Sequence, residues 1–194
     1  MSAMETSEVW DILERGGAIE TGHFQSPGGH SSVRFHSYNG LLDPRGAEAL
    51  GVALAGKLRE SGATAVMVWE ELEDLLLGFV VARELGCTLV RAYNDAGLVG
   101  DSPELPAGSK SVLVADQFVD EGAVRAVRAL VENRGGSLLS LGVLVDRGVV
   151  AGLPSVALVS ASENSYLPGQ CPLCQQGIPL ASASSLEGSD HGSA

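Results

Sequence analysis

Residues 111–127 read SVLVADQFVDEGAVRAV and pass from an apolar run through an acidic turn into an amphipathic segment. The run SVLVA, residues 111–115, has the length and composition of a strand that is buried on both faces. From about residue 121 to 134, apolar side chains recur every three or four positions, which predicts a helix: Val124, Val127, Leu130 and Val131. A strand followed directly by a helix is the building unit of a parallel α/β sheet.

The same alternation continues on both sides of this stretch. Upstream, TAVMVW (64–69) predicts a buried strand, ELEDLLLGFVVAREL (71–85) a helix and CTLVRA (87–92) another strand. Downstream, SLLSLGVLVDR (137–147) and SVALVS (155–160) complete the set of strands. The repeated order predicts an α/β fold: a doubly wound, mainly parallel sheet that is flanked by helices.

The remaining segments suggest one domain with an extension. Residues 1–160 are predicted to form the domain. Residues 93–110 have no apolar period and several structure breakers, so we expect a long loop there. Residues 161–180 form a segment with a Cys-x-x-Cys motif, and the small, polar residues 181–194 predict a disordered tail.

Composition and charge favour a globular protein that does not bind nucleic acid or membranes. The chain has 194 residues, 45% of them hydrophobic, and a formal net charge of -12. That charge repels nucleic acid and anionic lipid, and no apolar run is long enough to span a bilayer. The start, MSAMETSEVW, has no secretory signal, and three cysteines do not suggest a disulfide framework. We therefore expect a cytoplasmic protein.

Together with GHF (22–24) and GGHS (28–31), the segment SVLVADQFVDEGAVRAV after a long loop resembles the type I phosphoribosyltransferases, and among them the orotate phosphoribosyltransferases. The resemblance covers roughly residues 6–160. It implies the α/β fold with a small N-terminal hood of about residues 1–42, phosphoribosyl pyrophosphate as a substrate, and usually a dimer in which each mobile loop serves the other subunit. On the base-binding side it points to three hood residues: Phe24, His30 and Ser31.

The phosphate loop of this family has the form V-[DE]-D-V-x-T-T-G-G-S, and the corresponding residues here differ. After Val114 and Ala115 they are Asp116, Gln117, Phe118, Val119, Asp120, Glu121, Gly122 and Ala123. Asp116 keeps one of the two acids that engage the ribose, whereas both threonines are replaced. Two like charges about 4 Å apart repel by about 4 kcal/mol at an effective dielectric of roughly 20. Asp120 or Glu121 would thus oppose a bound phosphate.

Two other anion-binding features of the family are altered as well. The pyrophosphate turn is replaced by an acidic run: Glu70, Glu71, Leu72, Glu73 and Asp74. Arg91 matches the family's arginine, but Ala92 stands where orotate enzymes have a lysine. The mobile-loop region offers acids in place of basic residues, namely Asp95, Asp101 and Glu104. Loss of positive charge would remove the stabilisation of departing pyrophosphate.

Two functional interpretations remain open at this point. In the first, the chain is a catalytically degenerate homologue that needs no cofactor and acts as a ligand-binding, partner or regulatory subunit. It would form a homodimer or a heteromer with an active phosphoribosyltransferase. In the second, it is an active enzyme that uses phosphoribosyl pyrophosphate with orotate or another nucleobase, with Asp116 on the ribose, Arg91 on a phosphate and Mg²⁺ held by the extra acids. A third hypothesis is an assembly protein without a small-molecule pocket.

The histidines and cysteines do not form a recognisable metal motif along the sequence. His23, His30 and His36 share one segment, but their spacing matches no compact zinc pattern. Cys171 and Cys174 supply two of the four ligands that structural zinc requires, which favours a packing element. A metal would need His191 or the same cysteine pair of a second subunit. The sequence therefore predicts no metal site.

Overall fold

The computed structural model describes residues 4–26, 29–117, 121–148, 152–161 and 165–181. The chain divides into two compact units. The larger unit comprises Met1–Ile19 and Phe35–Glu163, and the smaller unit comprises Glu20–Arg34 and Asn164–Ala194. In the described part of the chain, no helix combines the length and hydrophobicity needed to cross a bilayer.

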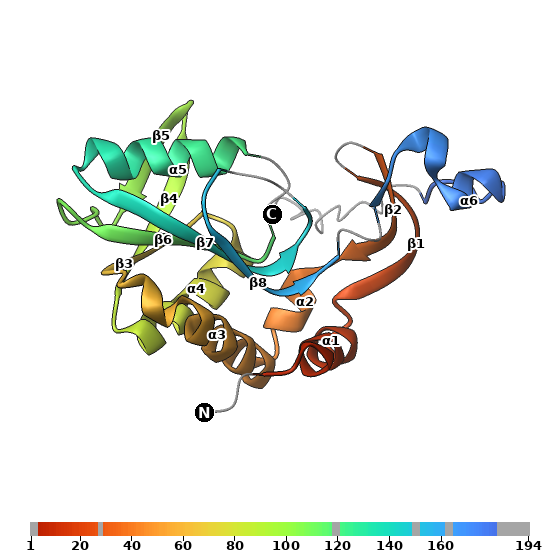
Figure 1. Ribbon diagram of the computed structural model, residues 1–194, viewed down its shortest axis with the longest axis horizontal. Helices are drawn as coiled ribbons and strands as arrows, with labels where there is room; N and C mark the ends of the chain where they lie inside the picture. The colour runs from red at the N-terminus through yellow and green to blue at the C-terminus, as the bar shows by residue number, and fades with distance from the viewer. Residues whose placement is uncertain (1–3, 27–28, 118–120, 149–151, 162–164, 182–194) are drawn as a thin grey trace, which may run out of the picture. The chain divides into compact units, whose positions relative to one another are not determined.

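A six-stranded sheet in the order β5-β4-β3-β6-β7-β8 forms the centre of the larger unit (Figure 1). Its strands are β3 (Ala65–Val68), β4 (Thr88–Asp95), β5 (Leu98–Ser102), β6 (Lys110–Ala115), β7 (Ser137–Asp146) and β8 (Ser155–Ser160). All neighbouring strands run parallel except β4 and β5, which are antiparallel. The predicted α/β fold class with a mainly parallel sheet is confirmed.

Helices cover both faces of this sheet. They are α1 (Thr6–Arg15), α2 (Ser37–Leu41), α3 (Pro44–Leu58), which continues into η1 (Arg59–Ser61), α4 (Leu72–Leu85) and α5 (Gly122–Asn133). Figure 1 shows α5 on one face and α3 and α4 on the other. On the α5 face, Val124, Val127 and Val131 pack against Met67 and Leu113 in the buried core. The alternating strand and helix pattern therefore produces a doubly wound sheet.

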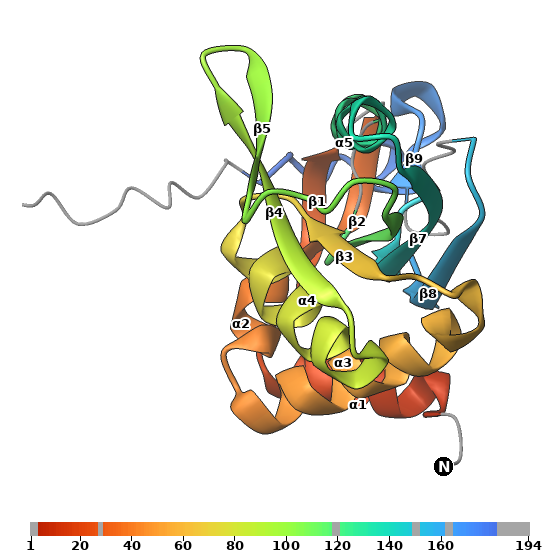
Figure 2. The ribbon, with the colours of Figure 1, turned by 90° about the vertical axis from the view of Figure 1, so that its left-hand side faces the viewer.

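The predicted loop at residues 93–110 is in large part a β-hairpin, so that prediction was wrong. β4 extends to Asp95, the turn contains Gly97 at φ +89°, and β5 returns at Leu98. Figure 2 shows the hairpin tip extending beyond the neighbouring strands. Tyr93 pairs with Gly100, where an added Cβ would lie 2.6 Å from the Tyr93 ring. The glycine that looked like a breaker thus makes room for an aromatic ring within the ladder.

The smaller unit is built from two segments that are far apart in the sequence. β1 (Ile19–Ser26), β2 (Gly29–Phe35) and β9 (Ser165–Tyr166) form a three-stranded sheet in that order. His30 pairs with Tyr166 across β2 and β9, and the short helices η3 (Pro168–Gln170) and α6 (Pro172–Gln175) follow. The predicted domain boundaries at about residues 42 and 160 stay predictions, and most of the predicted tail lies outside the described residues.

Candidate functional site at the carboxyl edge of the sheet

The two acidic loops of the sequence leave the sheet at neighbouring points. β3 and β6 pair in parallel, with Val68 opposite Val114, so the chain leaves both strands at the same edge. In open α/β sheets, ligands bind outside the carboxyl ends of the strands. The acidic run 70–74 follows β3, and Asp116 follows β6. This edge is therefore the candidate functional site.

Asp74 and Asp116 connect the two loops directly. The backbone N–H of Asp116 donates a hydrogen bond to Asp74 Oδ1 at 2.8 Å, and Asp74 is only 4% exposed. Burial and then the negative charge of Asp116 raise the pKa of Asp74 to about 8. Burial also raises the pKa of Asp116, whereas hydrogen bonds from Gln117 oppose that rise. Asp74 therefore retains its proton near neutral pH.

The other acids of the run 70–74 lie around the start of α4. Glu70 Oε1 accepts a hydrogen bond from the backbone N–H of Asn94 at 3.1 Å, which ties this turn to β4. Glu71 is the N-cap residue of α4, and Glu73 lies in its first turn. Carboxylates at a helix N-terminus stabilise the helix through its dipole. Leu72 is 48% exposed and contributes no polar group to the site.

The phosphate-loop position is described only at its two ends, since Phe118, Val119 and Asp120 lie outside the described residues. At its far end, Glu121 forms an exposed ion pair with Arg125 at 2.8 Å. α5 begins at Gly122, and Ala123 is half-buried in its first turn. The pairing with Arg125 reduces the repulsion that Glu121 would exert on an anion, although an exposed pair of this kind is weak.

Two acids that the sequence assigns to a mobile loop are instead held by Arg134. Asp101 Oδ1 binds Arg134 Nη2 at 2.8 Å, and Glu104 binds the same guanidinium. Asp101 Oδ2 also accepts the backbone N–H of Leu105 at 2.7 Å. Burial acts against ionisation of Asp101, but the bonds from Leu105 and Arg134 outweigh it and lower its pKa. Asp101 and Glu104 are therefore structural ion-pair residues.

Two arginines belong to the sheet near this edge, and the sequence analysis named one of them. Arg91 pairs with Val68 across β4 and β3, and its Cζ lies 5.0 Å from the centre of the Tyr93 ring. Arg147 follows directly after β7, with its Cζ 5.2 Å from the Phe35 ring. Burial lowers the pKa of Arg147. The sequence does hold a signal for it, an Asp-Arg pair at the end of an apolar strand.

The predicted base-side residues belong to the smaller unit and are engaged within it. Phe24 is buried, and the guanidinium Cζ of Arg34 lies 4.2 Å from its ring centre. The Ser31 hydroxyl donates to the Val33 carbonyl at 2.6 Å and accepts the Val33 N–H at 3.1 Å. His30 lies next to the side chains of His23 and Cys174. Each of the three residues thus has partners in its own unit.

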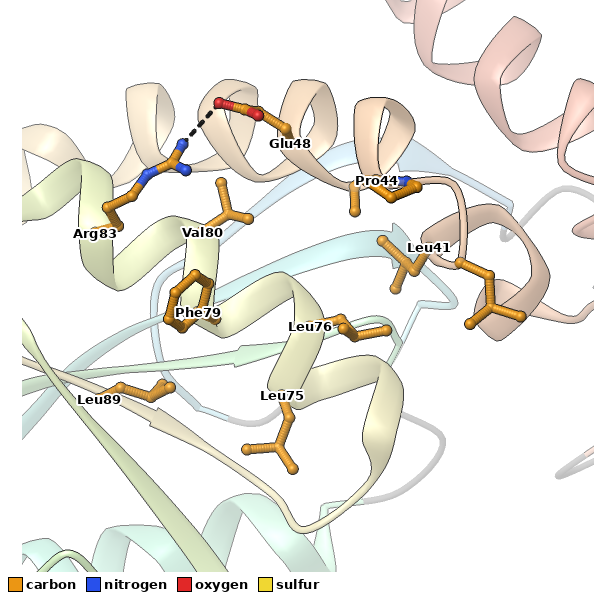
Figure 3. Close-up of a pocket in the computed structure, with 11 residues that line it drawn as sticks. Leu41, Pro44, Glu48, Leu75, Leu76, Phe79, Val80, Arg83 and Leu89 are labelled. Atoms are coloured by element: carbon orange, nitrogen blue, oxygen red, sulfur yellow. Dashed lines mark hydrogen bonds and ion pairs between the residues drawn. The ribbon is translucent and has the colours of Figure 1, made fainter.

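An open apolar pocket of about 480 Å³ lies elsewhere on the larger unit, among α2, α3 and α4 (Figure 3). Leu41, Leu75 and Leu76 line it, and Phe79, at its rim, is 61% exposed. An ion pair between Arg83 and Glu48 at 3.0 Å closes one end. None of the site residues that the sequence predicts lines this pocket.

Solved structures of similar fold include several phosphoribosyltransferases. The orotate phosphoribosyltransferase of Aeropyrum pernix has a TM-score of 0.66 and 21% identity, with 86% of this chain and 97% of that chain covered. The adenine phosphoribosyltransferase of Rhodothermus marinus has a TM-score of 0.59 and 17% identity, with 80% and 99% covered. The fold is that of the type I phosphoribosyltransferases.

Sequence comparison identifies the family of this chain within the type I phosphoribosyltransferases. No family model matches the chain. An orotate phosphoribosyltransferase of Desulforamulus reducens is 31% identical over 190 residues, which cover 95% of this chain and 99% of the relative. The orotate phosphoribosyltransferase of Pelotomaculum thermopropionicum is 33% identical, with 91% and 95% covered. The chain belongs to the orotate phosphoribosyltransferase family.

Proposed function

We propose that this chain is a non-catalytic member of its family, which binds a ligand or a protein partner at the carboxyl edge of the sheet. The observation that carries the proposal is the pair formed by buried Asp74 and half-buried Asp116. Phosphoribosyl pyrophosphate is a polyanion, and its binding would add negative charge at an edge where the charges of Asp116, Glu73 and Glu71 already help to raise the pKa of Asp74. The raised pKa of Asp74 reflects its burial first, and then the negative charges of Asp116, Glu73 and Glu71, which would also repel an anionic substrate.

The backbone donors at this edge support the same conclusion. Phosphate sites in α/β folds rely on free backbone N–H groups that point at the anion. Here the N–H of Asp116 donates to Asp74, and the N–H of Asn94 donates to Glu70. These two N–H groups at the carboxyl edge are therefore already bonded to acidic side chains and are not free to bind an anion.

A cationic or neutral ligand fits this edge better than an anion. Glu70 and Glu71 are exposed, and they could pair with a basic group of a small molecule or of a partner protein. The partner is a second copy of this chain or an active phosphoribosyltransferase, whose activity it would regulate. The net charge of -12 argues against nucleic acid as the ligand.

The second candidate function is an active phosphoribosyltransferase. It is supported by the names of the relatives, which match nearly the whole chain, and by Arg91 and Arg147 near the ligand-binding edge. Asp74 and Asp116 carry the hard oxygen ligands that Mg²⁺ prefers, so they and neighbouring acids would hold the ion. Bound Mg²⁺ would offset the negative charge of the pyrophosphate, and the products would be a nucleoside monophosphate and pyrophosphate.

Calorimetric titration separates the two candidates. The purified chain is titrated with phosphoribosyl pyrophosphate in the presence of Mg²⁺, and then with orotate and orotidine monophosphate. We expect no heat of binding at about 1 mM ligand, that is, a binding free energy weaker than about -4 kcal/mol. Micromolar binding of phosphoribosyl pyrophosphate would overturn the proposal and support the active enzyme.

A restoring variant provides the second part of this test. The double substitution Asp120→Thr and Glu121→Gly restores one threonine and one glycine of the family's phosphate loop but leaves Asp74 and the acidic run in place. We expect this variant to remain without orotate turnover, because the carboxyl pair stays. Glu132→Gln, which removes an exposed acid paired with Arg128, serves as the control. Robust turnover by the double variant alone would show that the altered loop, and not the acidic edge, limits catalysis.

A further inference from the structure

Four metal-binding side chains meet in the smaller unit. His23 and His30 come from the β1–β2 hairpin, and Cys171 and Cys174 come from the segment at α6. One ligand atom from each residue lies within 4.8 Å of all the others. In the sequence these residues are two separate features, and a metal seemed to require His191 or a second subunit. The structure supplies the missing two ligands from the same chain.

The distances within this cluster match those of a tetrahedral zinc site. His23 Nε2 lies 3.0 Å from His30 Nδ1, and Cys174 Sγ lies 3.1 Å from His30 Nδ1. Cys171 Sγ and Cys174 Sγ lie 3.4 and 3.6 Å from His23 Nε2. With Zn–N bonds of about 2.05 Å and Zn–S bonds of about 2.3 Å, ligand atoms of a tetrahedral site lie roughly 3.3–3.8 Å apart. Two of these distances lie within that range and two are slightly shorter, while all four atoms lie within 4.8 Å of one another, so side-chain shifts of up to about 1 Å accommodate the ion.

The surroundings of His23 prepare it to act as a ligand. Its Nδ1 lies 2.7 Å from the carbonyl oxygen of Ile178, to which it donates as N–H. That bond fixes the tautomer in which Nε2 carries a lone pair, and Nε2 is the atom that points at the two sulfurs. Metal-bound histidines commonly have such a second hydrogen bond. Ile178 itself belongs to the turn after Cys174, where its N–H donates to the Leu173 carbonyl at 3.0 Å.

The smaller unit also lacks the apolar core that would hold it together otherwise. Among its described residues, the buried hydrophobic ones are Phe24 and Cys171. Leu167 and Ile178 are 60% and 41% exposed. Small units with so little buried apolar surface are usually stabilised by disulfides or a structural metal. Two thiolates would also balance the charge of Zn²⁺, so the buried site would be neutral.

We propose that His23, His30, Cys171 and Cys174 bind one structural zinc ion. Four protein ligands leave no open coordination position, so the ion stabilises the fold and does not take part in catalysis. It joins the β1–β2 hairpin to the α6 segment beside the pairing of His30 with Tyr166. This inference does not depend on the proposed function of the carboxyl edge.

Metal content of the untagged chain, purified without added metal or chelator, is the first test. Elemental analysis should find about one zinc per chain. Cys171→Ser and Cys174→Ser should each lower that content at least about fivefold, since a thiolate ligand is lost. Cys87→Ser is the matched control, because Cys87 belongs to the larger unit and its thiol donates to the Ala63 carbonyl. It should keep the full zinc content.

Cobalt substitution tests the unaltered chain, so it does not depend on whether the variants fold. The reduced, metal-free protein should take up about one Co²⁺ and show the intense visible absorption of tetrahedral cobalt with thiolate ligands. X-ray absorption of the zinc form should show two sulfur and two nitrogen neighbours. Absence of zinc from the purified protein together with no uptake of Co²⁺ would overturn the proposal.

Thiol counting identifies what the cluster is if it holds no metal. The chain has three free cysteines: Cys87, Cys171 and Cys174. Alkylation of the denatured, chelator-treated protein without reductant should label all three. Labelling of Cys87 alone would indicate a disulfide between Cys171 and Cys174 and would refute the zinc site. Full labelling without any metal would leave a hydrogen-bonded histidine pair, which equally refutes it.

Discussion

The ionisation of Asp74 makes the free energy of unfolding depend on pH. Its pKa is raised to about 8, against an ordinary value of 3.8. Between about pH 4 and pH 8 the folded chain therefore holds a proton that the unfolded chain has released. Unfolding is then favoured as pH rises, and stability falls through this window and levels off above it. Each unit of such a shift corresponds to about 1.4 kcal/mol.

We predict that Asp74→Asn removes this pH dependence. Asparagine keeps an oxygen that accepts the Asp116 N–H, but it has no proton to lose. At pH 8 the variant should be more stable than the parent by at least about 1.4 kcal/mol, and the difference should shrink toward pH 4. Urea unfolding at pH 4.5, 6 and 8 measures it. An equal gain from the exposed Glu132→Gln would point to general charge repulsion instead.

Single residues also show what the sequence could and could not reveal about the site. The acidic run after β3 and Asp116 after β6 lie at the same edge, because parallel strands place their carboxyl ends together. The partners of Asp101 and Glu104 were not predictable, since Arg134 lies 30 or more residues further along the chain. Arg147 was overlooked because it was read as the last residue of a strand.

At the scale of elements, α4 packs very closely against β3 through a glycine. A Cβ added at Gly78 would lie 2.2 Å from Val68 Cγ1, so any larger residue must push the helix off the strand. The helix carries the acidic run at its N-terminus, and its position therefore sets the geometry of the carboxyl edge. Helix propensity alone would describe Gly78 only as a residue that weakens the helix.

We predict that Gly78→Ala destabilises the protein by about 1–3 kcal/mol, although alanine is the better helix former. Gly56→Ala is the matched control: Gly56 is exposed in α3, and an added Cβ there meets nothing within 4 Å. That change should stabilise the protein by about 0.5–1 kcal/mol. Thermal unfolding of both variants is the measurement. Stabilisation by both changes would mean that α4 can shift without cost.

The strands were predicted more reliably than the connections between them. Short apolar runs rich in valine mark β3 and β6, because strands buried on both faces must be apolar throughout. The β4–β5 hairpin escaped prediction since β5 has a glycine and an aspartate among its five residues. β5 is held in place by its pairing with β4 and by the bonds that Asp101 forms with Arg134 and Leu105. These are tertiary contacts, which a local sequence pattern does not report.

At the scale of the whole molecule, the family resemblance predicts a homodimer. Each chain has a formal net charge of -12, so two copies repel one another at low ionic strength. We expect light scattering to give twice the chain mass at about 0.3 M salt, with more monomer at about 0.02 M salt. A single monomeric species at both salt concentrations and at high protein concentration would rule the homodimer out.

The smaller unit escaped prediction because its two segments are separated by most of the chain. Sequence patterns report neighbours within a few residues, which suffices for helices, strands and their caps. His30 and Cys174 are 144 residues apart, and nothing local marks them as partners. The Cys-x-x-Cys motif could be recognised in the sequence, but its histidine partners could not, because they lie in a segment that was assigned to base binding.

Because β2 and β9 are far apart in the sequence, they are synthesised at different times. At typical translation rates of about 5–20 residues per second, His30 emerges roughly 7–30 s before Cys174. During that interval the β1–β2 hairpin has neither its third strand nor its cysteine partners, whereas β3 to β8 can already pair. We therefore expect nascent chains to depend on chaperones mainly at this hairpin, and the order of assembly to be sheet first and hairpin last.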